Sequence, residues 1–209
     1  MAEEVRVVPA PAADPAPLGL AAFALTTFLL SAANANWMTA ATGSAWLGYA
    51  LAYGGAMQVL AGIWEFRNRN VFGATAFSTY GGFWIGLFLW AQFVAPHATG
   101  AAADHDLGWI LLAFAVFNTY MLIMSTALNV AVFIVFLTLE ATEVILFIGN
   151  FAGSTGVVHF GGYVGVLTAL AAWYASAAGV SNGIAGNRIK LPVGPPLLAP
   201  NPVPVAVSA

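Results

Sequence analysis

Long apolar runs constrain this chain more than any other feature of its sequence. They recur along the 209 residues with short polar breaks between them, and each is long enough to cross a hydrocarbon core about 30 Å thick. Hydrophobic residues make up 61% of the chain and charged residues only 6%, which leaves too few polar side chains to cover a water-soluble fold. The sequence therefore predicts an all-α polytopic membrane protein.

Polar breaks and prolines divide the sequence into six predicted transmembrane helices. We expect these helices at about residues 18–36, 45–66, 72–94, 107–128, 129–149 and 155–180. Residues 1–17 are predicted to be a disordered N-terminal tail, and residues 183–209 a Pro-rich C-terminal tail that cannot continue a helix. Residues 18–182 then form a six-helix transmembrane domain, with its longest internal loop at residues 96–106.

The basic residues predict the orientation of these helices. With six spans, both tails, the loop between the second and third helices and the loop between the fourth and fifth helices lie on one side. All five basic residues fall in the tails and the first of these loops: Arg6, Arg67, Arg69, Arg188 and Lys190. Because cytoplasmic loops collect Lys and Arg, we expect both termini in the cytoplasm and the protein in a plasma or inner membrane.

A pattern of residues recurs after 80 positions. Asn70, Gly73, Thr75, Gly81 and Gly82 are matched by Asn150, Gly153, Thr155, Gly161 and Gly162. The match relates the third predicted helix to the sixth, and two units of three helices must insert in opposite directions. The pattern therefore predicts a 3+3 inverted repeat of the kind found in many transporters. The alternative is that glycines between aromatics are a general device for close helix packing.

Several short motifs carry a resemblance to a known family. They are Asp14–Leu20, Tyr53–Gly55 with Gln58, Ala61–Gly62 with Glu65, Asn70–Phe83, Ile148–Gly153 and His159–Phe160. Together they resemble the acetate uptake transporters, also called the succinate-acetate transporter family, from about residue 14 to Pro192. Asp14 stands where the family signature has Asn, and its side chain keeps an acceptor for the free N–H groups that begin a helix.

The resemblance implies a fold, a substrate and a site. Members of the family have six transmembrane helices, assemble as hexamers with one pathway per subunit, and move acetate, related small monocarboxylates or succinate. The narrowest point of the pathway is a hydrophobic constriction, which the motifs place at Phe23, Tyr80 and Leu139. An apolar constriction can gate by excluding water. The alternative for these three residues is ordinary core packing.

Four polar residues are candidates for the walls of the pathway. Thr27 and Asn34 follow Phe23 by four and eleven residues, so helical periodicity places them on its face. Gln58 and Asn150 are further candidates, and Asn150 has the repeat partner Asn70. Each could hydrogen-bond a passing carboxylate, or it could instead tie helices together within the membrane.

Two glutamates interrupt the fifth predicted helix, where the family leads us to expect apolar residues. Glu143 lies one turn beyond Leu139, and a carboxyl near mid-membrane costs on the order of 3 kcal/mol on insertion scales, which makes it a functional candidate. An ionised Glu143 would repel acetate, whereas a neutral one would not. We therefore hypothesise that Glu143 carries or relays a proton. Glu140 points about 100° away from Leu139 and is expected to bond to another helix or subunit.

Other classes of function find little support. The chain has no cysteine, no Ser, His and Asp arrangement and no set of histidines at ligand spacing, so we predict no enzyme activity, no metal and no cofactor. A net charge of −3 gives no reason to expect nucleic acid. The predicted function is a channel or transporter for acetate and related small carboxylates. The alternatives are a channel for formate, ammonia or bicarbonate, and a membrane sensor that does not transport.

Overall fold

The protein is a bundle of helices. The computed structural model describes residues 13–38 and 43–198, so residues 1–12 of the predicted N-terminal tail and 199–209 of the predicted C-terminal tail lie outside the described residues. Within them the helices are α1 (Ala16–Asn34), α2 (Trp46–Tyr49), α3 (Gln58–Arg67), α4 (Val71–Leu89), α5 (Ala102–Ser125), α6 (Val130–Phe151) and α7 (Thr155–Gly183). Two π-helical segments, η1 (Ala50–Met57) and η2 (Trp90–Val94), and the short 3-10 helix η3 (Ala95–His97) complete them, and no strand occurs in these ranges.

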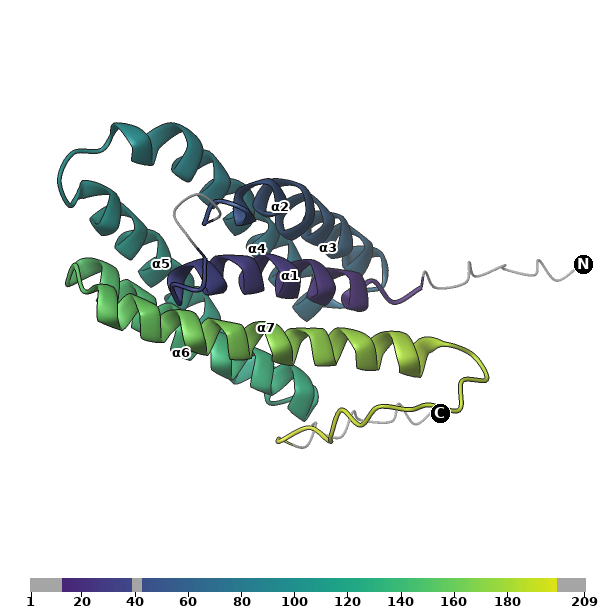
Figure 1. Ribbon diagram of the computed structural model, residues 1–209. Helices are drawn as coiled ribbons and strands as arrows, with labels where there is room; N and C mark the ends of the chain where they lie inside the picture. Colours follow the sequence, from purple (N-terminus) through teal and green to yellow (C-terminus); the bar gives the residue numbers. More distant parts are fainter. Residues whose placement is uncertain (1–12, 39–42, 199–209) are drawn as a thin grey trace, which may run out of the picture.

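Helix α1 occupies the centre of the bundle. It packs against α7 on one side and against η1 and α3 on the other, while α6 packs between α7 and α5 (Figure 1). Close approach is possible where residues are small: a Cβ atom at Gly54 of η1 would lie 2.6 Å from Thr26 Oγ1 of α1. Cross-helix contact through small residues is how membrane helices associate, since lipid supplies no hydrophobic drive between them.

The described helices confirm an all-helical membrane protein. Four of them, α1, α5, α6 and α7, are long and apolar enough to cross a membrane by length and composition. The other two predicted spans form helical runs at residues 46–67 and 71–94, each of which includes a π-helical segment. At the first of these segments the Thr26 hydroxyl of α1 lies 3.4 Å from the Tyr49 carbonyl oxygen, just before η1 begins, and 3.0 Å from the Ala22 carbonyl oxygen of its own helix. The count of six spans remains a prediction.

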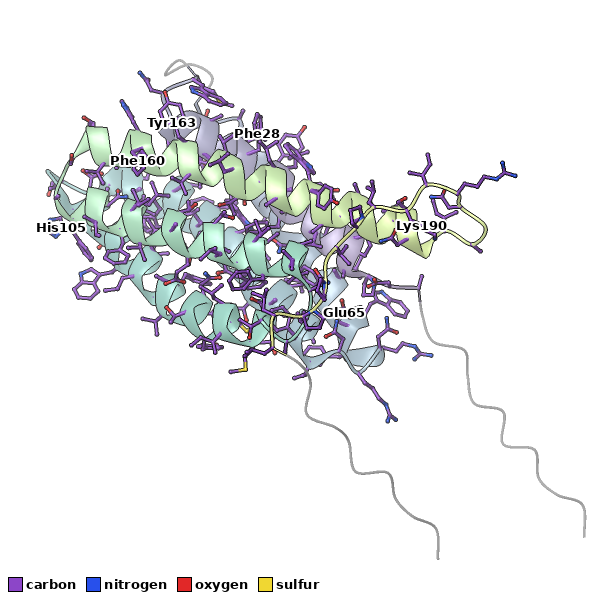
Figure 2. The ribbon with its side chains drawn as sticks, turned by 90° about the horizontal axis from the view of Figure 1, so that it is seen from below. Phe28, Glu65, His105, Phe160, Tyr163 and Lys190 are labelled. Carbon is purple, nitrogen blue, oxygen red and sulfur yellow. The ribbon has the colours of Figure 1, made fainter. Side chains whose placement is uncertain are left out.

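One predicted loop is shorter than expected. Helix α5 begins at Ala102 instead of residue 107, so Asp104, His105 and Asp106 belong to its first turns. A carboxylate in the first turn of a helix interacts favourably with the unpaired N–H groups there, which explains the earlier start. Figure 2 shows His105 at one end of the bundle and Lys190 at the opposite end.

The repeated pattern occupies related but not identical places. Asn70 caps α4, with its Oδ1 accepting from the Gly73 N–H at 3.1 Å, whereas Asn150 lies inside α6. Ser154, four residues further on, takes the corresponding place as the cap of α7. The turns before both caps contain a residue with positive φ, which is Arg69 (φ 60°) in one and Gly153 (φ 58°) in the other. The inverted repeat itself stays a prediction.

The glycine pair of the pattern supplies one testable contact. A Cβ atom at Gly81 would lie 2.7 Å from Val59 N and 2.9 Å from the Gly55 carbonyl oxygen, both backbone atoms, whereas one at Gly82 would meet nothing within 4 Å. We expect Gly81→Ala to lower the free energy of unfolding by about 1–3 kcal/mol, because the backbone must move to admit the methyl group. Denaturant titration of the detergent-solubilised protein measures this, with Gly82→Ala as the adjacent control. Equal stability of the two variants would contradict the close contact.

The segment after α7 returns to the bundle. Its backbone meets the turn between α5 and α6, where the Ala131 N–H donates to the Val193 carbonyl oxygen at 2.9 Å and the Leu197 N–H donates to the Thr126 carbonyl oxygen at 2.8 Å. The Tyr174 hydroxyl of α7 donates to the Pro192 carbonyl oxygen. Residues 192–197, hereafter the C-terminal strap, are non-helical and are held against the helices.

Candidate substrate pathway

Three cavities follow one another through the bundle. The wide cavity has a volume of about 230 Å³ and opens where α1 begins, beside Asp14 and Asn129. The middle cavity has a volume of about 40 Å³ and the far cavity about 80 Å³. The middle and far cavities share four wall residues: Leu30, Asn34, Leu111 and Leu146.

The three predicted constriction residues form the wall between the wide and middle cavities. Phe23, Tyr80 and Leu139 line both cavities, and no other described residue does so. They come from α1, α4 and α6, and each is at most 6% exposed. The Phe23 and Tyr80 rings meet edge to face with centroids 5.8 Å apart, a favourable aromatic geometry. We call these three residues the neck.

Aromatic side chains hold the Tyr80 ring in place. Its centroid lies 5.5 Å from that of Phe117, 5.9 Å from Phe114 and 6.2 Å from Phe83. Phe160 and Tyr163 follow Tyr80 and Phe83 by 80 positions, the spacing of the repeated pattern. Their side chains are instead 59% and 48% exposed and lie at the surface of the bundle in Figure 2. Only one of the two repeated motifs therefore presents its aromatics to the cavities.

The four predicted polar residues all line the cavities. Gln58 lies in the wide cavity, Thr27 and Asn34 in the middle one, and Asn34 and Asn150 in the far one. Thr27 Oγ1 and Gln58 Oε1 are buried without a hydrogen-bond partner among the described residues, while Asn150 Nδ2 donates to the Leu146 carbonyl oxygen at 2.8 Å. A buried polar atom without a partner is costly, so these two oxygens are available to a permeating molecule or water.

Glu143 lies directly beyond the neck. It is 3% exposed and lines the middle cavity, as its spacing from Leu139 predicts. Its Oε1 is 3.2 Å from Tyr80 Oη, and its Oε2 has no partner among the described residues. The Tyr80 hydroxyl also lies 3.0 Å from Oδ1 of Asn118, a fully buried residue of α5.

Sequence analysis missed Asn118. A polar amide in the middle of an apolar span was the signal that could have found it. Its Nδ2 lies 2.8 Å from Glu140 Oε2, and Thr119 Oγ1 lies 2.9 Å from Glu140 Oε1. Glu140 thus bonds to another helix, α5, which was one of the two outcomes that its position predicted.

Glu65 also differs from a simple surface charge. Its side chain is 1% exposed and lines the wide cavity, where a Cβ atom at Gly73 would lie 2.7 Å from its Oε1.

Within residues 13–38 and 43–198 no group of three or more His, Cys, Asp or Glu side chains could hold a metal ion.

Long apolar helices around an internal, necked series of cavities define a multi-pass membrane protein. The chain belongs to the GPR1/FUN34/yaaH family, whose sequence profile matches residues 3–193.

Relatives and one solved structure show how far the likeness extends. The chain is 39% identical over 183 residues to accumulation of dyads protein 2 of Saccharomyces cerevisiae, covering 84% of this chain but only 65% of the yeast protein. It is 34% identical over 182 residues to the succinate-acetate/proton symporter SatP of Escherichia coli, covering 87% of this chain and 95% of SatP. The solved structure of the bacterial acetate channel SatP superimposes with a TM-score of 0.81 at 33% identity, covering 88% of this chain and 99% of that one.

Proposed function

We propose that the chain forms a transmembrane pathway for acetate and related small carboxylates, including succinate, with Phe23, Tyr80 and Leu139 as its constriction. One observation carries the proposal: the wide and middle cavities meet only at these three side chains. A short apolar neck between two chambers that each contain a few polar side chains can admit small solutes and gate by excluding water. The names of the bacterial relative and of the matching structure support the same substrate class.

The dimensions beyond the neck favour a small substrate. The middle cavity has a volume of about 40 Å³ against about 230 Å³ for the wide cavity, so it is much the smaller of the two chambers that meet at the neck. Thr27 and Asn34 supply hydrogen-bonding groups there and Gln58 supplies one before the neck. A two-carbon carboxylate can exchange its hydration shell for these groups one at a time as the neck opens.

Glu143 is the proposed proton-carrying group of this pathway. It stands where a carboxylate emerges from the neck, and an ionised Glu143 would repel that carboxylate across a cavity with little water to screen the charge. Neutral Glu143 removes the repulsion. Carboxylate movement is then coupled to whatever sets the protonation of this residue.

The arrangement of the helix ends supports an orientation. The beginning of α1, the end of α3 and Lys190 lie toward one end of the bundle (Figures 1 and 2), which supports six spans with both termini in the cytoplasm. Large apolar side chains remain exposed around the bundle, as they are for contact with lipid or further subunits. We propose a homohexamer in a plasma or inner membrane that acts as a transporter and not as an enzyme.

Flux into proteoliposomes tests the proposed function. Purified protein should carry isotopic acetate into vesicles at rates well above protein-free vesicles, with competition by unlabelled succinate. The same assay with formate, bicarbonate and ammonia tests the alternative channel functions. Flux of one of these solutes without acetate flux would show that it, and not acetate, is the substrate. Absence of flux for every solute would favour a membrane sensor.

A further inference from the structure

The side-chain amide of Asn118 hydrogen-bonds on both of its sides, toward Tyr80 of the neck and toward the outer side of α6. Its Nδ2 group donates to the Phe136 carbonyl oxygen at 3.0 Å and to Glu140 Oε2 at 2.8 Å. The opposite orientation of the amide would bring its oxygen against both of these oxygens, so the hydrogen bonds fix which atom is which. Asn118 Oδ1 therefore faces the Tyr80 hydroxyl and can only accept a hydrogen from it.

This orientation decides the direction of the contact between Tyr80 and Glu143. A phenol has a single hydrogen, and both Asn118 Oδ1 at 3.0 Å and Glu143 Oε1 at 3.2 Å lie within its reach. Because Asn118 Oδ1 cannot donate, both contacts are hydrogen bonds only when Asn118 takes the phenol hydrogen. The contact of 3.2 Å between Tyr80 Oη and Glu143 Oε1 then needs a hydrogen from Glu143. Only the neutral carboxylic acid can supply one.

We propose that Asn118 is a positioning residue that keeps Glu143 protonated by engaging the only hydrogen of the Tyr80 hydroxyl. The inference rests on the proposed pathway and deepens it, because neutral Glu143 is the form past which a carboxylate can move. Asn118 lines none of the three cavities. Its hydrogen-bonded route to Glu143 runs through Tyr80.

Removing the Asn118 oxygen as an acceptor allows the hydrogen bond between Tyr80 and Glu143 to reverse its direction. With an apolar side chain at position 118, the Tyr80 hydroxyl can turn its hydrogen toward Glu143 Oε1 and stabilise the ionised carboxylate. A hydrogen bond to a charged group is strong enough to move a titration by about one pH unit or more. Ionised Glu143 would then oppose carboxylate passage at a lower pH than in the natural chain.

The remaining charged groups around Glu143 are few. Tyr80 and Glu143 are the only titratable side chains that line the middle cavity, and α1 carries none between Ala16 and Asn34. On α5, the Tyr120 ring reaches Tyr80 only through Phe117. The titratable residues of α7 (His159, Tyr163 and Tyr174) lie outside that wall.

The hydrogen bonds of Glu140, the neighbour on α6, fit either of its protonation states. The Thr119 hydroxyl lies 2.9 Å both from Glu140 Oε1 and from the Ala115 carbonyl oxygen, so its single hydrogen can serve either. It donates to an ionised Glu140, or it accepts from a neutral one and donates to Ala115. The network therefore specifies the protonation of Glu143 but not that of Glu140.

The pH profile of flux tests the role of Asn118. In Asn118→Leu, the pH at which acetate flux is half-maximal should fall by about one unit. The double variant Asn118→Leu with Glu143→Gln should show the same profile as Glu143→Gln alone, because the residue on which Asn118 acts can no longer ionise. Ser125→Ala is the matched control, since Ser125 is a fully buried polar residue of α5 that bonds only to the Leu122 carbonyl oxygen of its own helix. An unshifted profile in Asn118→Leu, or a shift that persists in the double variant, would refute the proposal.

A second measurement does not depend on flux. The infrared carbonyl band of a protonated carboxyl should be present in the natural protein at neutral pH, absent in Glu143→Gln, and lost at lower pH in Asn118→Leu. If acetate does not move but this band behaves as expected, the proposed function fails and the role of Asn118 stands. Absence of a Glu143 band at neutral pH would refute that role even if Asn118→Leu does not fold.

Discussion

Tyr80→Ala should raise the flux of succinate relative to that of acetate by about tenfold, which corresponds to ~1.4 kcal/mol off the barrier for the larger substrate. The ring of Tyr80 separates the wide and middle cavities together with Phe23 and Leu139, so its loss joins the two cavities and hydrates the neck. The measurement is the ratio of succinate to acetate uptake into proteoliposomes at one pH.

Two further variants separate size from hydrogen bonding in this experiment. Tyr163→Ala removes the same ring from an exposed position of α7, where it packs on Trp37, and should leave the ratio unchanged. Tyr80→Phe keeps the ring and removes the hydroxyl that meets Asn118 and Glu143, so the ratio should stay low. If Tyr80→Ala behaves like Tyr163→Ala, Tyr80 is not part of the constriction.

Glu143→Gln should flatten the pH dependence of acetate flux. The glutamine amide stays uncharged at every pH, whereas neutral Glu143 becomes tenfold scarcer for each pH unit above its titration. The ratio of variant to natural flux should therefore rise by about tenfold per unit in that range. Taking this ratio cancels the ionisation of acetate itself.

The control for this variant removes a carboxylate elsewhere. Asp104→Asn makes the same change of charge in the exposed first turn of α5, far along that helix from Asn118, and should keep the natural profile. A constant ratio for Glu143→Gln across pH would show that Glu143 holds no proton of consequence to transport.

The sequence predicted much of the pathway because helical periodicity acts within one helix. Phe23, Thr27 and Asn34 share a face of α1 at any rotation of its neighbours, and Glu143 must follow Leu139 on α6. Family motifs then supplied the one relation that periodicity cannot, which is that α1, α4 and α6 bring these faces together. The structure places these residues around one series of cavities, while their roles in transport stay predictions.

Features that depend on contacts between helices were not predictable in the same way. The bond from Asn118 to Glu140 requires a particular rotation of α5 against α6, which no single-helix pattern encodes. The π-helical segments η1 and η2 arise where packing and side-chain bonds compete with the regular backbone ladder. The earlier start of α5 reflects helix-end electrostatics at Asp104 that an apolar-run criterion does not count.

The C-terminal strap imposes an order on assembly. Val193 accepts the hydrogen of Ala131 N–H in the first turn of α6, where a helix has no partner of its own for that group. Because α7 and the strap are synthesised after α6, that N–H must stay with water or lipid headgroups until the last described part of the chain has emerged. The first turn of α6 therefore gains this partner only after the rest of the bundle has been synthesised, and a nascent chain without the strap would leave the Ala131 N–H without it.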